Sequence, residues 1–164
     1  MNDENNCAIY MFPTKALAQD QLRALKELTR AMNIELNMCV YDGDTPQNQR
    51  QYLRENSRLL ITNPDMLHVG MLPCHKLFAR FFHNLRYIVL DEAHSYRGNF
   101  GSNTAMVIRR LRRICTFEHQ NTSGPQFIVS SATIANPREH VQQLTGVRDV
   151  RKTFGQLALF GIDG

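Results

Sequence analysis

Two adjacent carboxylates, Asp91 and Glu92, directly follow a short apolar run at residues 87–90. A continuous apolar run of this length is typical of a strand buried on both faces of a parallel sheet. Ligands of open α/β sheets bind beyond the carboxyl ends of the strands, which is where this pair is expected to emerge. The alternative is a strand that ends in a solvated acidic turn.

Two carboxylates at a buried strand end are costly to ionise unless a cation lies beside them. The Mg²⁺ that accompanies a nucleoside triphosphate is such a cation, so the pair is consistent with a site for a nucleoside triphosphate and Mg²⁺. In that site Asp91 is expected to hold the metal through a water molecule. Glu92 is expected to orient and deprotonate the attacking water.

The elements that must position this pair alternate along the chain as strand, polar turn and helix. The apolar runs predict strands at residues 8–12, 34–41, 58–62, 87–90 and 126–130. Helical periodicity predicts helices at residues 15–31, 47–55, 65–68, 76–83, 101–115 and 137–144. The first helix carries an apolar stripe formed by Ala18, Leu22, Leu25, Leu28 and Met32. This alternation is typical of an α/β fold with a mostly parallel sheet covered by helices on both faces.

The predicted helix 101–115 separates an apolar face from a basic one. Its apolar face consists of Val107, Ile108, Leu111, Ile114 and Cys115. The opposite side carries Arg109, Arg110, Arg112 and Arg113 without acidic partners on the same helix. Such a face is either simply solvated or in contact with an anion.

Length and composition limit the class of protein. The chain has 164 residues, enough for one α/β domain, and a net charge of +4 with a pI near 9.0, which favours an anionic partner such as nucleic acid. Its four cysteines are scattered, and its polar N-terminus lacks the pattern of a signal peptide. No apolar run approaches eighteen residues, so no membrane association is expected. We expect an intracellular location, nuclear in a eukaryote and cytoplasmic in a bacterium.

Short polar segments follow each predicted strand, and the carboxyl ends of parallel strands meet at one edge of the sheet. The five segments lie within the strings FPTKALAQDQLRAL, YDGDTP, TNPDMLH, LDEAHSYRGNFGS and SSATIANP. In order and spacing they resemble motifs Ia, Ib, Ic, II and III in the first RecA-like domain of superfamily 2 helicases with a DEAH box. The resemblance is strongest to the branch of RecQ-like, YprA-type (mitomycin repair factor A) DNA helicases, and it covers most of residues 9–137.

The resemblance implies a RecA-like fold and an ATP-dependent motor that translocates on nucleic acid and unwinds it. The implied substrate is single-stranded or duplex DNA, with 3′–5′ polarity and a role in DNA repair. It implies that His94 couples the ATP site to motif III, where Ser131 and Thr133 link hydrolysis to strand movement. A Ser-Ala-Thr sequence after a strand could equally cap a helix.

The resemblance also implies which residues contact the phosphates of one nucleic-acid strand. Backbone amides at helix starts, short hydroxyls and a lysine hold a phosphate backbone without reading its sequence. Thr14 and Asp65 could instead, or in addition, cap helices. The predicted nucleic-acid-binding residues are Pro13, Thr14, Lys15, Gly43, Thr45, Thr62 and Asn63.

One feature of the family is missing from these residues. No phosphate-binding loop of the form G-x-x-x-x-G-K-[ST] occurs in the sequence. In the family this loop precedes motif Ia, and a second RecA-like domain follows motif III. Residues 1–164 are therefore expected to form a partial helicase ATP-binding domain that lacks the P-loop strand and helix and does not hydrolyse ATP alone. The alternatives are a catalytically inactive, nucleic-acid-binding or regulatory fragment, and an RNA helicase of the same superfamily.

Overall fold

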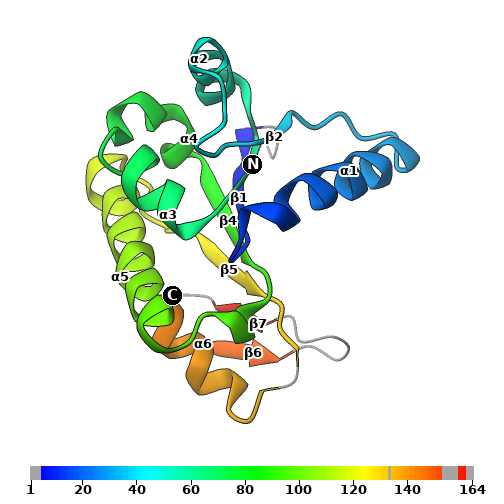
Figure 1. Ribbon diagram of the computed structural model, residues 1–164. Coiled ribbons are helices and arrows are strands. Elements are labelled where there is room, and N and C mark those ends of the chain that lie inside the picture. Colours follow the sequence, from blue (N-terminus) through cyan, green and yellow to red (C-terminus); the bar gives the residue numbers. More distant parts are fainter. Residues whose placement is uncertain (1–4, 133, 153–158, 162–164) are drawn as a thin grey trace.

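The computed structural model describes residues 5–132, 134–152 and 159–161, and within them the strands form one sheet (Figure 1). The strand order is β2-β3-β1-β4-β5-β7-β6. The first five strands along this order are parallel, and β7 and β6 continue the sheet in antiparallel pairing. Their bounds are β1 (Cys7–Met11), β2 (Met38–Val40), β3 (Leu59–Thr62), β4 (Leu85–Leu90), β5 (Gln126–Val129), β6 (Val150–Lys152) and β7 (Leu159–Gly161).

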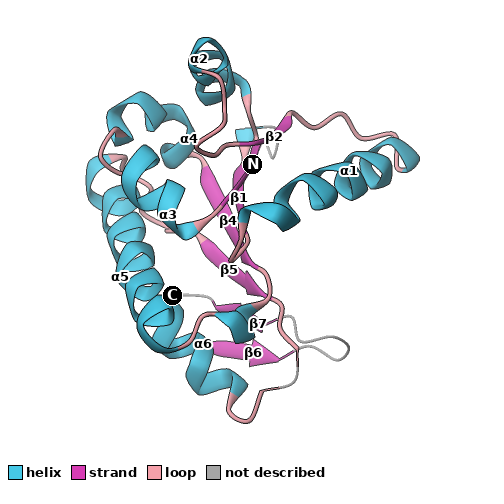
Figure 2. Ribbon diagram, viewed as in Figure 1, coloured by secondary structure: helices cyan, strands magenta, loops and turns pink. Residues whose placement is uncertain are grey.

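Helices cover both faces of this sheet (Figure 2). Helix α1 lies on one side, and α3, α4 and α5 lie on the other, as Figure 1 shows. The bounds are α1 (Lys15–Ala31), α2 (Gln47–Asn56), α3 (Pro64–Met66), α4 (Ala79–His83), α5 (Gly98–Arg113) and α6 (Pro137–Thr145). Single π-helical turns extend α3 over Leu67–Met71 and α5 over Ile114–Glu118, and short 3₁₀ turns occupy His75–Phe78 and Ala93–Ser95. The predicted α/β architecture is confirmed.

The core is a continuous apolar layer across the parallel strands. Ile9, Leu60, Ile88 and Phe127 are neighbours on four adjacent strands, and all four are completely buried. Each such side chain contributes about 1.5–3 kcal/mol of transfer free energy, which is an upper value because unfolded chains already bury some surface. The buried face of α5 includes Val107, Ile108 and Leu111, as its periodicity predicts. This layer fixes the register of the strands and hence the positions of their ends.

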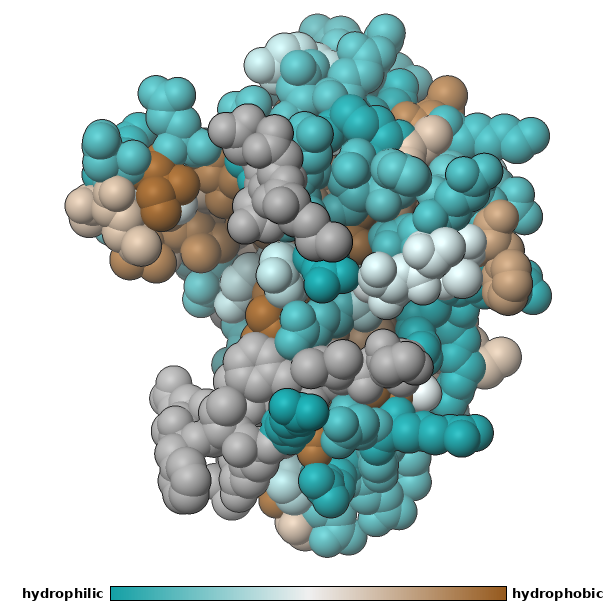
Figure 3. Space-filling view, turned by 180° about the vertical axis from the view of Figure 1, so that it is seen from behind, coloured by the Kyte–Doolittle hydropathy of each residue, from teal (hydrophilic) through white to brown (hydrophobic). Residues whose placement is uncertain are grey.

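Helix α1 differs from α5 in how little of its apolar stripe is buried. Ala18 is buried, but Leu28 and Met32 keep 55% and 59% of their surface exposed. Ala18, Leu22 and Leu25 pack in the small cluster that contains Phe12 and Ile61. Figure 3 shows apolar side chains at the surface of this part of the molecule. The bounds of α1 agree with the prediction, while burial of the whole stripe, which its periodicity indicated, is not found.

Two predicted boundaries were wrong for identifiable reasons. Strand β2 begins at Met38 and not at residue 34, because its neighbour β3 begins at Leu59, the residue that pairs with Met38. Helix α5 begins at Gly98 and not at residue 101. Gly101 lies in its first turn, where an added Cβ would come within 2.4 Å of the Tyr96 carbonyl oxygen. Only glycine allows this close approach of the helix to the turn that follows β4.

Candidate nucleotide and nucleic-acid site

The polar segments that follow β3, β1, β4 and β5 meet at one edge of the sheet, as predicted. Backbone hydrogen bonds continue past the strand ends: the Phe12 amide donates to the Thr62 carbonyl oxygen (3.1 Å), and the Ser130 amide donates to that of Leu90 (3.0 Å). Between them, the Asp91 amide donates to the Met11 carbonyl oxygen (3.0 Å). These bonds fix the relative positions of the backbone from which the candidate side chains project.

Asp91 is the most extensively hydrogen-bonded of the predicted catalytic residues. Its Oδ1 accepts from the Glu92 amide (2.9 Å) and from the Ser130 hydroxyl. Its Oδ2 accepts from the Tyr10 hydroxyl at 3.3 Å. Hydrogen bonds to a carboxylate are stronger than those between neutral groups, so three donors hold this side chain in one orientation. Asp91 is therefore positioned before any ligand arrives.

The tyrosines around Asp91 are kept in their neutral form. Burial, together with the Asp91 carboxylate, raises the pKa of Tyr10 to about 12. Tyr96 is more deeply buried; burial and the same carboxylate raise the pKa of its phenol further still. The Tyr96 hydroxyl donates to the Met11 carbonyl oxygen at 3.4 Å. Both phenols therefore remain hydrogen-bond donors at neutral pH.

Glu92 adopts a backbone conformation that is unusual for its type. Its φ of 51° and ψ of 43° lie in the left-handed region, which costs non-glycine residues about 1–2 kcal/mol. This conformation turns the chain sharply between β4 and the 3₁₀ turn Ala93–Ser95. The Glu92 side chain remains 45% exposed at the edge of the sheet. A carboxylate in this place is accessible to a water molecule, as a general base must be.

His94 lies between Glu92 and the segment after β5. Its Nδ1 is 3.2 Å from Oε2 of Glu92 and 3.3 Å from the Ala132 amide nitrogen. An unprotonated Nδ1 accepts from Ala132, whereas a protonated Nδ1 donates to Glu92. The two bonds exclude each other, so His94 connects motif II to the motif III segment through a choice between two partners.

Of the predicted motif III residues, Ser131 is described and Thr133 lies outside the described residues. The Ser131 hydroxyl is buried and has no hydrogen-bond partner within the part of the chain that the structure describes. A buried hydroxyl without a partner is uncommon and costly. Ser131 is therefore available to form a bond when a neighbouring group moves or a ligand binds.

The nucleic-acid candidates at the end of β1 include one charged group with partners. The Lys15 ammonium contacts the Asp44 carboxylate and lies 3.9 Å from that of Asp42. The hydrogen bond to Asp44 raises the pKa of Lys15. Thr14 occupies the N-cap position of α1 but forms no capping hydrogen bond, and it is exposed beside the partly exposed Pro13. The first amides of α1 therefore have no capping bond from Thr14, whose side chain is exposed beside them.

The remaining nucleic-acid candidates are engaged in building turns. The Thr62 hydroxyl is buried and donates to the Tyr41 carbonyl oxygen at 2.8 Å. The buried Thr45 hydroxyl accepts from the Asp42 amide at 2.9 Å. Asn63 caps α3 by accepting from the Met66 amide at 2.8 Å; capping by Asp65, the alternative that the sequence suggested, is not found, because Asp65 lies in the first turn of α3. Gly43 has open space where a Cβ would lie. Phosphate contact by these residues stays a prediction.

Three residues of this site were missed by the sequence analysis. Tyr10 and Ser130 bind Asp91, and His140 of α6 bonds through Nε2 to the Ala93 carbonyl oxygen at 2.7 Å. Ser130 was placed inside the fifth strand, although a serine directly before Ser131 could have indicated a strand-end position. Tyr10 and His140 carry no local signal, because their partners are 81 and 47 residues away.

The arrangement around Asp91 is compatible with Mg²⁺ held through water. Each carboxylate oxygen offers two lone pairs. Oδ1 already has two donors and Oδ2 has one, so Oδ2 can accept one further bond from a water of the metal. Mg²⁺ commonly retains several of its waters in proteins. The donor set therefore fits an indirect contact better than a direct one.

Comparisons with known proteins agree with this geometry. Residues 1–141 match the DEAD/DEAH box helicase family. The chain is 55% identical over 144 residues to the uncharacterised ATP-dependent helicase YprA of Bacillus subtilis, covering 88% of this chain and 19% of YprA. It is 44% identical over 152 residues to the ATP-dependent helicase HRQ1 of Saccharomyces cerevisiae, covering 92% of this chain and 14% of HRQ1.

A solved structure shares the fold at the same level of identity. The crystal structure of the DUF1998 helicase MrfA bound to DNA is 55% identical and superposes with a TM-score of 0.83, covering 88% of this chain and 20% of that one. The chain thus spans about a fifth or less of these relatives. Among the described residues, no helix is long and apolar enough to cross a membrane. By sequence and by fold, the chain belongs to the DEAD/DEAH box helicase family, with a RecA-like arrangement of its sheet.

Proposed function

We propose that this chain is part of an ATP-dependent DNA helicase motor, carrying motifs Ia to III of its first RecA-like domain. The observation that carries the proposal is the orientation of Asp91 by Tyr10, Ser130 and the Glu92 amide, next to an exposed Glu92. A carboxylate fixed by three donors beside a second, accessible carboxylate suits the metal-binding and base roles of a nucleoside triphosphatase. A solvated acidic turn would not require such support.

In this function Asp91 would hold Mg²⁺ through a water molecule, and Glu92 takes the proton of the attacking water. Bound Mg²⁺ would neutralise charge on the phosphates of ATP. His94 exchanges Nδ1 between Glu92 and Ala132, so that a change at Glu92 reaches the segment that contains Ser131. Ser131 and Thr133 carry the coupling to strand movement in this proposal.

The nucleic-acid side of the motor uses the strand-end turns. Thr14, the first amides of α1 and Lys15 contact one phosphate group, and Lys15 must leave Asp44 to do so. Further phosphates of the same strand contact the adjoining turns at Pro13, Gly43, Thr45, Thr62 and Asn63. We favour DNA over RNA because MrfA, at 55% identity, was crystallised with DNA. Unwinding with 3′–5′ polarity in DNA repair, and an intracellular location, are parts of this proposal.

The chain itself is proposed not to turn over ATP. Its 164 residues contain no G-x-x-x-x-G-K-[ST] loop, whose amides and lysine supply most of the contacts to the phosphates. The test compares the purified chain with a longer polypeptide in which a P-loop segment precedes residue 1. We expect only the longer polypeptide to bind a fluorescent ATP analogue with Mg²⁺ and to hydrolyse ATP.

Glu92→Gln in the longer polypeptide should reduce hydrolysis by roughly 10²- to 10⁴-fold while leaving analogue binding unchanged. Glu55→Gln, an exposed glutamate on α2, is the matched control and should have no effect. DNA-stimulated hydrolysis by the short chain would contradict the proposed inactivity. Full activity of the Glu92→Gln variant would contradict the assignment of the base.

A further inference from the structure

The four arginines of α5 divide into two pairs. Arg109 donates to the Gln143 carbonyl oxygen (3.1 Å) and Arg112 to that of Thr145 (3.2 Å), so this pair fastens α5 to α6. Arg110 and Arg113 make no side-chain hydrogen bond or ion pair within the residues that the structure describes. The sequence predicted a single basic face. In the structure, Arg109 and Arg112 attach α5 to α6, whereas Arg110 and Arg113 have no such partners among the described residues; we call them the uncommitted pair.

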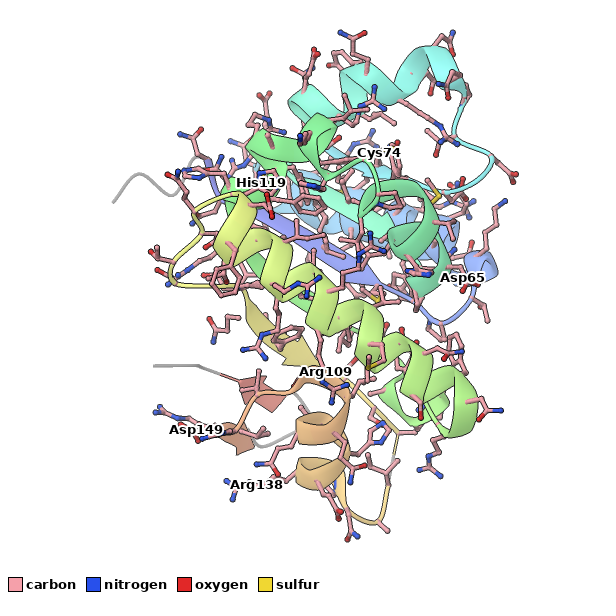
Figure 4. The ribbon with its side chains drawn as sticks, turned by 90° about the vertical axis from the view of Figure 1, so that its left-hand side faces the viewer. Asp65, Cys74, Arg109, His119, Arg138 and Asp149 are labelled. Carbon is pink, nitrogen blue, oxygen red and sulfur yellow. The ribbon has the colours of Figure 1, made fainter. Side chains whose placement is uncertain are left out.

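Arg110 and Arg113, together with Arg109, line a pocket of about 660 Å³ between α5 and the segment Pro64–His68. Figure 4 shows α5 with Asp65 on one side of it and Arg109, beside α6, on the other. The pocket wall also includes Thr104, which is 1% exposed and whose hydroxyl has no partner among the described residues. Because an unsatisfied buried hydroxyl is costly, Thr104 points to a polar group that a ligand supplies.

A second pocket, of about 400 Å³, lies further along α5 and is also lined by Arg110 and Arg113. It reaches His75, Glu118 and Phe117, whose ring is 76% exposed. The two pockets share Arg110 and Arg113 and so adjoin along α5 between Phe100 and Phe117; we name this surface the α5 groove. At helical rise it is roughly 25 Å long, the length of about seven stacked nucleotides.

We propose that the α5 groove binds a single-stranded segment of nucleic acid, beyond the phosphates contacted at the strand ends. Arg110 and Arg113 supply the cations for its phosphates, and Phe100 and Phe117 supply rings on which bases stack. Pro64 lines the groove and directly follows Asn63, so the groove continues from the predicted path of the strand. This inference rests on the proposed function, because it extends the same ligand.

The acidic residues of the groove favour nucleic acid over an acidic peptide. Asp65 and Glu118 lie in its walls, and both would repel the carboxylates of an acidic peptide as well as the phosphates of a nucleic acid. Bases instead carry amino and imino groups that donate to carboxylates. A ligand with phosphates, stacking faces and hydrogen-bond donors matches all three kinds of side chain in the groove.

The test measures binding of fluorescent oligothymidylates of 5 to 20 nucleotides to the purified chain, by anisotropy at several salt concentrations. The double variant Arg110→Ala/Arg113→Ala should weaken binding of the longest oligonucleotide roughly tenfold and lower the salt slope by about 1.4, the value for two phosphate contacts. The gain in affinity between short and long oligonucleotides should also disappear. Phe117→Ala should remove part of that gain without changing the salt slope.

Matched controls separate the groove from net charge and folding. Arg86→Ala/Arg148→Ala removes the same charge at exposed arginines elsewhere, and Tyr52→Ala removes an aromatic ring that is 63% exposed on α2. Both should leave the length dependence unchanged, and thermal unfolding should show that all variants are folded.

If the unmodified chain binds oligonucleotides and the groove variants behave like the controls, this inference is wrong and the proposed function stands. If the folded chain binds none of them, both are wrong; binding of polyglutamate that depends on Arg110 and Arg113 would assign the groove to an acidic protein instead.

Discussion

Asp91 and Lys15 are charged groups that follow neighbouring strands at the same edge of the sheet, yet they are held in different ways. Asp91 has three hydrogen-bond donors and tolerates little movement. Lys15 is exposed and paired with carboxylates of the turn after β2, chiefly Asp44, which is itself 82% exposed. The first group is fixed before its ligand binds, and the second must exchange partners. In the proposed function, the side of the site assigned to ATP is therefore preorganised, and the side assigned to nucleic acid is adaptable.

The largest expected effect comes from removing the fixed carboxylate. Asp91→Ala leaves the Ser130 and Tyr10 hydroxyls and the Glu92 amide without their acceptor, so we expect the free energy of unfolding to fall by about 2–3 kcal/mol. Urea denaturation followed by circular dichroism measures this change. Asp44→Ala is the control, because it removes a carboxylate from the exposed pair and should cause no resolvable loss. Equal losses of unfolding free energy in the two variants would show that Asp91 is held no more firmly than the exposed Asp44.

A smaller effect is expected at alkaline pH. Because the pKa of Tyr10 is raised from 10.0 to about 12, its contribution to stability is fully present below pH 10 and is lost as the pH rises to 12. Over this pH range the free energy of unfolding should therefore fall by about 1 kcal/mol less in Tyr10→Phe than in the unmodified chain. This value allows for the partial exposure of Tyr10. Denaturation at pH 9.5 and pH 11.5 tests this. Tyr52→Phe, at an exposed site away from Asp91, should behave like the unmodified chain.

The smallest expected effect concerns the adaptable side. Asp44→Asn weakens the hold on Lys15, so single-stranded DNA should bind roughly two- to fivefold more tightly, because less competition remains for the ammonium. Asp20→Asn makes the same charge change on α1, where Asp20 pairs with Arg23 at 3.9 Å, and should have a smaller effect. An equal gain from both variants would show that net charge, and not release of Lys15, is responsible.

The sequence predicted the elements whose signals are local. Helix α1 was predicted with its observed bounds because its periodicity is long and begins at a favourable N-cap. Strand β2 was predicted too long, since its start depends on where β3 offers a partner. The clustering of strand ends followed from the parallel arrangement alone. Tyr10 and His140 could not be predicted, because their contacts arise only when distant parts of the chain are packed together.

The arginines of α5 show the same limit of prediction from sequence, here for single side chains. Periodicity placed the arginines of α5 outside the core, which is confirmed, but it could not separate Arg109 and Arg112 from Arg110 and Arg113. That separation depends on α6, whose carbonyl oxygens at Gln143 and Thr145 accept from the first pair. A lysine offers a point charge and lacks the planar fork of a guanidinium, so replacement by lysine would preserve charge but not this attachment.

The left-handed backbone of Glu92 places chemistry and stability in opposition at one residue. Glycine adopts this conformation without steric penalty, so the substitution that would most relax the turn also deletes the carboxylate. If Glu92 is the base, as proposed, selection of a longer polypeptide carrying the P-loop for heat resistance alone would favour Glu92→Gly and would yield a more stable protein without ATPase activity. Position 92 therefore shows what a protein-design method takes into account. A method that keeps glutamate there includes function, and a method that replaces it optimises the stability of the fold alone.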